Sequence, residues 1–440
     1  MKKLRQLMTI FLALSITMLV GCSSSIVGIK RLSNENWIED IDYLDNTMKY
    51  RHPDLFRNIS EEEWDQNINE LKENVGELSD IDIGLSISQI ISSIQDAHTI
   101  VDIFSVMTPI GKDTIGYEDI VAFPFRYEWF DDGLRVNSCL DDYKEVLGYK
   151  LVSINNISTD EIIKKLFTIV SYDNEQSAKS SAIEYMTIYE VLRFLDIVDK
   201  QEAKFVFEDD NKEEVTLKVK PQLNKDIKFT SLDHKIFKTE EKPEGARDEY
   251  WFKPIEEDNS LYFQYNSCIS NNATFLSEED RSKYPNFHEF EEELIDYIND
   301  NNFDKFVIDL RKNGGGSMGL TSSLIMKLKS NTDIEKSKIY VITGKNTFSA
   351  GAISAWHLKN NLDVTIVGEE TGGNVNLFSR FPEDDIIELK NSKLRIIHSS
   401  SYVNYKPGYK GGVKPDVEIK QNYKDYINGI DNCYEYIINN

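Results

Sequence analysis

The sequence predicts a multidomain α+β fold, with an N-terminal helical region, a central α+β module and a C-terminal α/β core built from βαβ units. Apolar residues recur at helical spacing up to about residue 95, strand patterns dominate the middle, and strand and helix patterns alternate beyond residue 258. Such alternation is typical of a largely parallel sheet covered by helices. We place the three parts at residues 34–114, 115–222 and 256–440, with 223–255 as a linker or an inserted loop.

The composition is that of a globular protein. The chain has 440 residues, of which 40% are hydrophobic and 11% aromatic, so it can bury a sizeable core and is neither generally disordered nor a small disulfide scaffold. Lys and Arg number 50 against 75 Asp and Glu, giving a formal net charge of −25. Because this charge repels a phosphate backbone, we expect no nucleic-acid partner.

The N-terminus has the pattern of an export signal. Basic residues precede an apolar run, Leu7–Val20, which is shorter than the roughly 20 residues that a membrane span needs. Cys22 then follows in a setting that resembles the lipobox of bacterial lipoproteins. This implies a signal peptide over residues 1–21, a lipid on Cys22, a tether over residues 22–33 and a location on the extracytoplasmic face of a bacterial membrane. A plain secretory signal and a short uncleaved anchor are the alternatives.

The remaining cysteines predict no metal site. Cys139, Cys268 and Cys433 are far apart, and no CxxC pair or Cys/His cluster is present. We therefore expect no metal and no cofactor. One disulfide could form between two of the three in an oxidising compartment, and the sequence does not select the pair.

The N-terminal region should contain three amphipathic helices. The first ends before Pro53, because the residue preceding a proline disfavours the helical conformation. Ser60 and Glu63 form a capping box that starts the second helix, and the third ends at Asp96-Ala97-His98-Thr99. Their apolar stripes are Trp37, Ile41, Leu44 and Met48, then Trp64, Ile68, Leu71 and Val75, then Ile83, Ile87, Ile90, Ile91 and Ile94.

The later elements follow the same reasoning. In the central module we expect an amphipathic helix over 161–166 and a hairpin of strands 205–207 and 215–217. In the core, the expected strands are 261–265, 306–310, 339–343 and 364–367, and the expected helices are 290–298, 320–328 and 350–358. Two loops, Asn313–Gly316 and Thr347–Gly351, follow carboxyl ends of these strands, where α/β proteins place their chemistry.

Ser349 has the setting of a nucleophile. It lies at a strand-to-helix turn, where free N–H groups favour negative charge, and the small residues Ala350 and Gly351 follow it. The alternative is that Ser349 simply caps a helix, as serine often does. The glycines at 314–316 could supply a second N–H group to an oxyanion hole, or could simply form a flexible connection.

A serine nucleophile also needs a base, and His98 is the best candidate among six histidines. It follows a buried-looking helix within a polar cluster. The alternative is a histidine that stabilises a helix C-terminus. His357, which lies two turns beyond Ser349, remains a second candidate for the base.

Several blocks, in this order, resemble peptidase family S41, the C-terminal processing or tail-specific proteases and their tricorn-core relatives. Val307–Gly316 is similar to the DLRxNxGG loop of the family, and Thr347–Gly351 to its nucleophile segment. The other matching blocks are Gly368–Gly373, Gly411–Val417, Asp96–Thr99 and Leu147–Ile157, the last of which resembles part of a PDZ-like module.

The resemblance implies roles for these residues. Ser349 would be the nucleophile, and Gly314, Gly315 and Gly316 with the N–H of Ala350 would stabilise the oxyanion. Residues 115–222 would be a PDZ-like module and residues 256–440 the peptidase core, acting on a protein or peptide substrate.

The sequence departs from the family at one position. Aligning the family's catalytic lysine places Asn374 there, and asparagine cannot act as a base. The consistent alternative is a Ser-His arrangement of the tricorn type, in which His98 takes the proton from Ser349. Glu369, Glu370, Asp96 and Asn374 could each orient His98, and we favour Glu370.

The expected function is therefore a lipid-anchored serine endopeptidase that hydrolyses exported or unfolded proteins. One alternative is a non-catalytic pseudoprotease that binds peptides or apolar ligands on the same fold. Another is a structural lipoprotein whose PDZ-like module recruits a partner protein.

Overall fold

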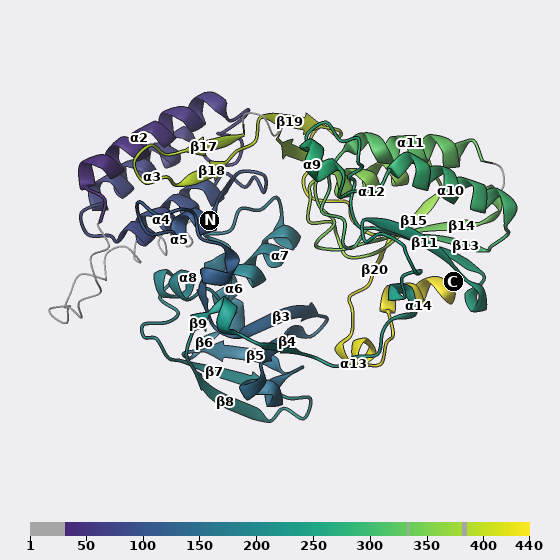
Figure 1. Ribbon diagram of the computed structural model, residues 1–440, viewed down its shortest axis with the longest axis horizontal. Helices are drawn as coiled ribbons and strands as arrows, with labels where there is room; N and C mark the ends of the chain where they lie inside the picture. Colours follow the sequence, from purple (N-terminus) through teal and green to yellow (C-terminus); the bar gives the residue numbers. More distant parts are fainter. Residues whose placement is uncertain (1–30, 332–333, 381–384) are drawn as a thin grey trace. The chain divides into compact units, whose positions relative to one another are not determined.

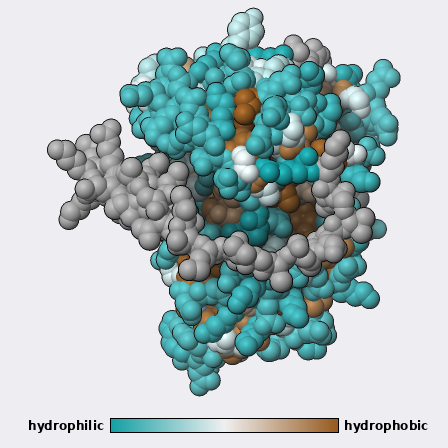
Figure 2. Space-filling view, turned by 90° about the vertical axis from the view of Figure 1, so that its left-hand side faces the viewer, coloured by the Kyte–Doolittle hydropathy of each residue, from teal (hydrophilic) through white to brown (hydrophobic). Residues whose placement is uncertain are grey.

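The computed structural model describes residues 31–331, 334–380 and 385–440. The predicted signal peptide, Cys22 and most of the predicted tether lie outside these residues. Within the described part, no helix combines the length and the apolar character that crossing a bilayer requires. On the face shown in Figure 2 most of the described side chains are hydrophilic, consistent with the high net charge.

The N-terminal region contains the three predicted helices. The capping box at Ser60 is present, and the first helix ends one residue before His52. Trp37, Trp64 and Ile83 are buried, so the apolar stripes form the interior of this region. Its elements are α2 (Asn34–Arg51), α3 (Glu61–Asn74), α4 (Asp80–Ser92), β1 (Ile100–Val101) and α5 (Ile103–Met107).

The central module is a seven-stranded sheet with helices. The strand order is β10-β4-β5-β7-β8, with β3 paired to β4 and β6 paired to β5. The predicted hairpin is β7 with β8, and the predicted helix is α6. The elements are β3 (Phe125–Phe130), β4 (Gly133–Leu140), β5 (Lys150–Ile154), β6 (Ile157–Ser158), α6 (Thr159–Leu166), α7 (Glu175–Tyr185), α8 (Tyr189–Phe194), β7 (Ala203–Glu208), β8 (Glu214–Val219) and β10 (Phe229–Ser231); β2 (Val121–Ala122) pairs with β9 (Gln222–Leu223).

The C-terminal core is built on a six-stranded sheet in the order β11-β12-β13-β14-β15-β20. The strands from β12 to β20 are parallel, as predicted, and β11 is an antiparallel edge strand. The strands are β11 (Tyr250–Ile255), β12 (Ser260–Tyr265), β13 (Lys305–Asp309), β14 (Lys338–Thr343), β15 (Val364–Gly368) and β20 (Val417–Glu418).

Helices cover both faces of this sheet. Because strand residues alternate between faces, Phe306 and Ile308 pack with α10, α11 and α12, whereas Val307 and Ile342 pack with α14 (Figure 1). The helices are α9 (Glu278–Arg281), α10 (Phe287–Asp300), α11 (Met318–Lys329), α12 (Ala350–Asn361), α13 (Tyr423–Ile427) and α14 (Asn432–Ile438).

Three segments differ from the sequence-based expectation. Strands β10 and β11 both lie inside the segment 223–255 that was assigned to a linker or loop. Strand β10 pairs with β4 of the central sheet, and β11, which begins with three consecutive aromatic residues, pairs with β12 of the core sheet. The hairpin of β17 (Ile386–Glu388) and β18 (Arg395–Ile397) pairs with β1, far from the core sheet. The turn between these strands is held by Asp40 of α2, which accepts hydrogen bonds from the N–H groups of Asn391 and Ser392. After β16 (Asn376–Ser379), the chain therefore adds the β17–β18 hairpin to the N-terminal region. It then forms β19 (Ser401–Asn404), which pairs with β16.

Candidate active site

Ser349 lies where the chain turns from β14 into α12. It occupies the N-cap position of α12 but makes no capping hydrogen bond with its side chain. Its backbone has φ 50° and ψ −125°, a conformation that non-glycine residues adopt rarely and that is often associated with functional sites. Because its side chain makes no capping hydrogen bond, Ser349 does not act as the helix cap that the sequence left open as an alternative.

Glycine backbone surrounds Ser349 on two sides. A Cβ atom at Gly315, where φ is +109°, would lie 2.7 Å from the Cβ of Ser349. A Cβ atom at Gly373 would lie 2.7 Å from the backbone nitrogen of Ser349. Both separations are shorter than side-chain atoms tolerate, so two sequence blocks from different loops approach the serine only because they are glycine.

His98 and Ser349 are in contact although 251 positions separate them. The Nε2 atom of His98 lies 3.0 Å from the Oγ atom of Ser349. The imidazole stacks on Phe348, with ring centroids 4.7 Å apart, and its side chain is only 9% exposed. The turn after α4 and the turn before α12 thus bring together the two residues that the sequence selected as base and nucleophile.

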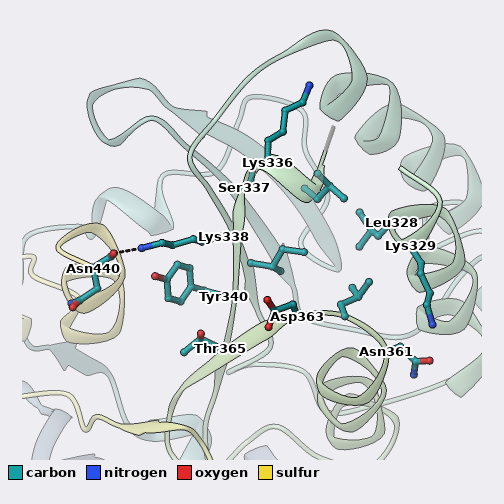
Figure 3. Close-up of a pocket in the computed structure, with 13 residues that line it drawn as sticks. Leu328, Lys329, Lys336, Ser337, Lys338, Tyr340, Asn361, Asp363, Thr365 and Asn440 are labelled. Carbon is teal, nitrogen blue, oxygen red and sulfur yellow. Dashed lines mark hydrogen bonds between the residues drawn. The ribbon is translucent and has the colours of Figure 1, made fainter. Parts of the chain in front are cut away.

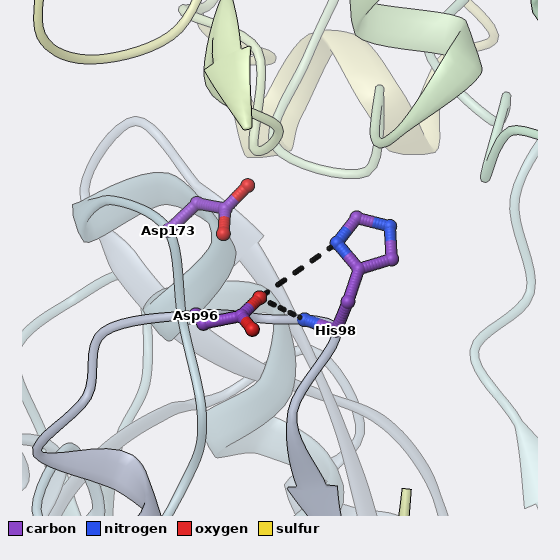
Figure 4. Close-up of side chains that lie close together, drawn as sticks. All are labelled: Asp96, His98 and Asp173. Carbon is purple, nitrogen blue, oxygen red and sulfur yellow. Dashed lines mark hydrogen bonds and ion pairs between the residues drawn. The ribbon is translucent and has the colours of Figure 1, made fainter. Parts of the chain in front are cut away.

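Asp96 lies behind His98 and is completely buried. One of its oxygens, Oδ1, accepts the backbone N–H of His98 at 2.9 Å and lies 4.0 Å from the Nδ1 atom of that residue (Figure 4). The other, Oδ2, accepts from the hydroxyl of Thr99 at 2.5 Å and lies 3.1 Å from Nε2 of His52. Burial opposes ionisation of Asp96, but the hydrogen bond from His52 and the charge of His98 outweigh it and lower the pKa of the carboxyl.

The neighbours of His52 determine which of its nitrogens carries the proton. The backbone N–H of Asp54 donates to Nδ1 of His52, so this nitrogen is an acceptor. The proton of a neutral His52 is then on Nε2, from which it is donated to Asp96. His52 therefore supports the charge on Asp96 from the side opposite to His98.

A second carboxylate, Asp173, completes the group. Its two oxygens accept the backbone N–H groups of Ala97 and Asn374, at 2.9 Å and 3.2 Å. Burial and the neighbouring charge of Asp96 raise the pKa of Asp173 to about 7, against the opposing effect of the two N–H donors. Asp173 thus links the loop of His98 to the loop after β15.

The Nδ1 atom of His98 is buried and has no hydrogen-bond partner among the described residues. Burial lowers the pKa of His98, and the charge of Asp96 only partly offsets this effect. The imidazole is therefore neutral at neutral pH, as a general base must be. For Nε2 to accept the proton of Ser349, Nδ1 must carry the other proton, and the nearest acceptors are the carboxylates of Asp96 and Asp173.

The structure places the other candidates for orienting His98 elsewhere. Glu370 accepts the backbone N–H of Gly412 at 2.8 Å, and no hydrogen bond or ion pair of the described residues joins it to His98. Glu369 lies 3.3 Å from the ammonium of Lys345. Asn374 donates to the backbone carbonyl of Asp173 at 2.9 Å and accepts from Asn174 at 3.0 Å. Asn374 therefore holds the Asp173 loop through its amide.

Three backbone N–H groups, two on the glycine loop and one at the start of α12, have no hydrogen-bond partner among the described residues. They are those of Gly314, Gly316 and Ala350. The N–H of Gly315 already donates to Oδ1 of Asn313 at 3.0 Å. Gly315 therefore serves mainly to let its loop approach Ser349 closely. The N–H groups of Gly314, Gly316 and Ala350 remain free to donate to an oxyanion.

A buried ion cluster holds the start of the glycine loop. Arg311 bridges the carboxylates of Asp309 and Asp431, with N–O distances of 2.6 Å and 2.5 Å. The hydroxyl of Tyr262 donates to Asp309 at 2.5 Å. Burial opposes ionisation of Asp309, but Arg311 and these hydrogen bonds lower the pKa of its carboxyl. Because Asp431 caps α14, the cluster joins the start of the glycine loop to the N-terminus of that helix.

A pocket of about 790 Å³ lies at the opposite end of the sheet, where β14 and β15 begin (Figure 3). Lysine side chains line it, and Lys338 donates to the backbone oxygen of Asn440. Ser349 follows the carboxyl end of β14, so this pocket is not part of the candidate active site.

Sequence reasoning missed His52 and Asp173. In the sequence, His52 marked only the end of a helix before a proline, and nothing singled out Asp173, which precedes the N-cap of α7 in the structure. Neither position carries a local pattern that points to His98.

The three described cysteines are buried and unpaired, so none of them forms the disulfide that the sequence left open.

Comparison with known proteins supports one family. The sequence model of peptidase family S41 matches residues 320–419, which include Ser349. Mature CPAF complexed with lactacystin aligns over 92% of this chain and 97% of that chain, at 12% identity and a TM-score of 0.62. A second structure of mature CPAF aligns over 92% and 96%, at 12% identity and a TM-score of 0.59. At this identity the likeness shows a shared fold. A search of curated proteins gave no match.

Proposed function

We propose that the chain is a serine-type peptidase of family S41, whose sequence model matches residues 320–419, and that it cleaves peptide bonds by attack of Ser349, with His98 as the general base. The observation that carries this proposal is the distance of 3.0 Å between Nε2 of His98 and Oγ of Ser349. This contact lies within the range that proton transfer to a positioned base requires.

The reaction would proceed in two halves. In the first, Oγ of Ser349 attacks the carbonyl carbon of the peptide bond while Nε2 of His98 takes the hydroxyl proton. The tetrahedral intermediate collapses when His98 returns this proton to the leaving amine, which leaves an acyl-enzyme on Ser349. In the second half, His98 takes a proton from water, which attacks the ester carbonyl; His98 then returns this proton to the departing Oγ of Ser349, and the carboxylic acid product is released.

Backbone N–H groups would stabilise the charge on the carbonyl oxygen. The N–H of Ala350 is at the N-terminus of α12, where the helix dipole also favours a negative charge. A second donor would come from Gly314 or Gly316, which flank the buried Gly315 on the adjoining loop.

We propose Asp96 as the group that orients His98, in place of Glu370. Asp96 is buried, its pKa is lowered, and Oδ1 lies 4.0 Å from Nδ1 of His98. A small rotation of the imidazole would bring the two atoms to hydrogen-bond distance. Glu370 instead accepts a hydrogen bond from Gly412, so its carboxylate supports the loop before β20.

A test should separate catalysis from simple binding. The purified chain is treated with a fluorophosphonate and analysed by mass spectrometry, and cleavage of unfolded casein is measured in parallel. We expect a covalent adduct on Ser349, no adduct in Ser349→Ala, and slow labelling with greatly reduced cleavage in His98→Ala. A folded protein that neither labels nor cleaves between pH 5 and pH 9 would contradict the proposal and favour a pseudoprotease that captures peptides.

We further propose that the peptidase is a lipoprotein anchored through Cys22 on the extracytoplasmic side of a bacterial membrane and acts on exported or unfolded proteins. The basic residues, the short apolar run and the lipobox-like setting of Cys22 support this location. Labelling with a radioactive fatty acid followed by detergent phase partition tests it. The label should appear in the full chain and disappear in Cys22→Ser; equal labelling of both would contradict the anchor.

A further inference from the structure

Asp96, His98 and Asp173 form a cluster with the donor set of a transition-metal site. Each contributes one potential ligand atom, and these atoms all lie within 4.8 Å of one another. In Figure 4 the carboxyl groups of Asp96 and Asp173 and the Nδ1 edge of His98 face a common space. The three residues come from the turn after α4 and the loop before α7, so the cluster is assembled only in the folded chain.

A second observation indicates a cation at this place. The side chain of His98 is 91% buried, and its Nδ1 atom has no hydrogen-bond partner while it faces the two carboxylates. None of the ion pairs among the described residues joins Asp96 or Asp173 to a lysine or an arginine. The site therefore combines a nitrogen atom that has no hydrogen-bond partner with two carboxyl groups that form no ion pair with a described lysine or arginine.

The surroundings also resemble those of metal ligands in proteins. Ligating carboxylates are usually held by further hydrogen bonds, and Asp96 accepts from His52 and Thr99 while Asp173 accepts from two backbone N–H groups. Imidazole and carboxylate donors together suit Zn²⁺, whereas Mg²⁺ and Ca²⁺ prefer oxygen ligands alone.

We propose that Asp96, His98 through Nδ1, and Asp173 bind Zn²⁺ and that this binding inhibits the peptidase. Tetrahedral zinc separates its N and O ligands by about 3.3 Å, so the 4.0 Å between Nδ1 and Oδ1 of Asp96 must shorten by a small rotation. A water molecule completes the coordination.

The inhibition follows from the chemistry of imidazole and rests on the proposed function. Zinc on Nδ1 occupies that lone pair, so the proton of the neutral ring must be on Nε2. Nε2 then donates to Ser349 instead of accepting its proton, and the nucleophile has no base. Removal of zinc returns the proton to Nδ1 and restores Nε2 as an acceptor.

Binding is measured first, without any use of activity. The full chain carrying Ser349→Ala is titrated with Zn²⁺ against a chromophoric chelator, with Mg²⁺ as the control ion. We expect one Zn²⁺ per chain with micromolar or tighter affinity and no competition by Mg²⁺. Asp173→Asn and His98→Gln should each weaken binding at least tenfold, whereas Glu175→Gln, at an exposed carboxylate two residues away, should leave it unchanged.

Two results would overturn the metal site: no stoichiometric Zn²⁺ binding up to 100 times the chain concentration, or binding that Asp173→Asn and Glu175→Gln alter equally.

The wild-type chain is then assayed for casein cleavage with zinc and after addition of EDTA. Cleavage should fall over the same zinc range in which binding occurs and recover with EDTA; unchanged cleavage at saturating zinc would overturn the inhibition. If the zinc-free chain does not cleave while binding persists, the proposed peptidase function fails and the metal site stands.

Discussion

His52 donates a hydrogen bond from Nε2 to Oδ2 of Asp96 at 3.1 Å, and both side chains are fully buried. His52 thus belongs to the proton network of His98 although it touches neither His98 nor Ser349. It is a positioning residue, because it acts through Asp96. The carboxylate can keep its charge inside the protein only while such donors surround it.

Replacing His52 therefore tests this network. We expect His52→Ala to lower kcat/KM by about tenfold or more, since a lost hydrogen bond to a buried charge costs about 1.5 to 3 kcal/mol. The acid limb of the pH-rate profile should move, because the carboxyl would protonate more readily. His52→Gln, whose amide can donate to Asp96, should recover part of the activity; an unchanged pH profile in His52→Ala would contradict the role.

The glycine loop gives a sharp steric prediction. Gly315→Ala would place a Cβ atom 2.7 Å from the Cβ of Ser349, at a φ of +109°. We expect at least a tenfold lower kcat and a lower melting temperature, because the nucleophile and its loop must move apart. Gly319→Ala is the control, since the Oγ atom of Ser317 lies at an ordinary 3.7 Å from its Cβ position. Equal effects of the two substitutions would count against a close approach at Gly315.

Asp173 should make stability fall as the pH rises. Its pKa is raised to about 7 in the folded chain against an ordinary value of 3.8, so the folded state binds more protons between these values. Its contribution to the free energy of unfolding is therefore fully present below about pH 4, falls as the pH rises, and is lost above about pH 7.

Urea denaturation of Ser349→Ala with and without Asp173→Asn measures this effect. Relative to its parent, Asp173→Asn should be more stable at pH 8 than at pH 5. The opposite trend, or none, would show that the carboxyl of Asp173 is ionised throughout this range.

A lysine at the family position should not restore a Ser-Lys mechanism. The amide of Asn374 donates to the backbone carbonyl of Asp173 and accepts from Asn174, and a lysine side chain can replace only the first of these contacts. We expect Asn374→Lys to lower the melting temperature and to leave casein cleavage dependent on His98. Full activity of the double variant His98→Ala, Asn374→Lys would contradict the Ser-His assignment.

The ion cluster at Arg311 predicts a link between α14 and the active-site loop. Asp431→Ala removes one of the two carboxylates that Arg311 bridges and should destabilise the chain by about 3 kcal/mol. Lys312→Ala removes only an exposed pair with Glu240 at the adjacent position and should change stability by less than about 1 kcal/mol. Chemical denaturation of both variants, with casein cleavage measured beside it, tests whether the cluster supports the loop.

The sequence by itself predicted most of the helices and strands that position the candidate site. Helical spacing gave α2, α3 and α4 their positions, and the alternation of apolar strands with helices gave the parallel core sheet. These patterns are local, because each element must bury its own apolar face. Ser349 and His98 could be selected as nucleophile and base because the short motifs that contain them resemble those of a known family; their positions at the ends of elements alone fitted capping roles equally well.

The tertiary structure alone decided which side chains surround His98. Asp173 and His52 reach this site from distant segments, and Glu370, which had the right chemistry, instead faces Gly412. The hairpin of β17 and β18 likewise leaves the core and pairs with β1. Contacts between distant segments depend on how whole layers pack, and a carboxylate or an imidazole carries no local pattern that encodes its partner. The physical reason is that elements are determined by neighbours along the chain, whereas a catalytic network is determined by neighbours in space.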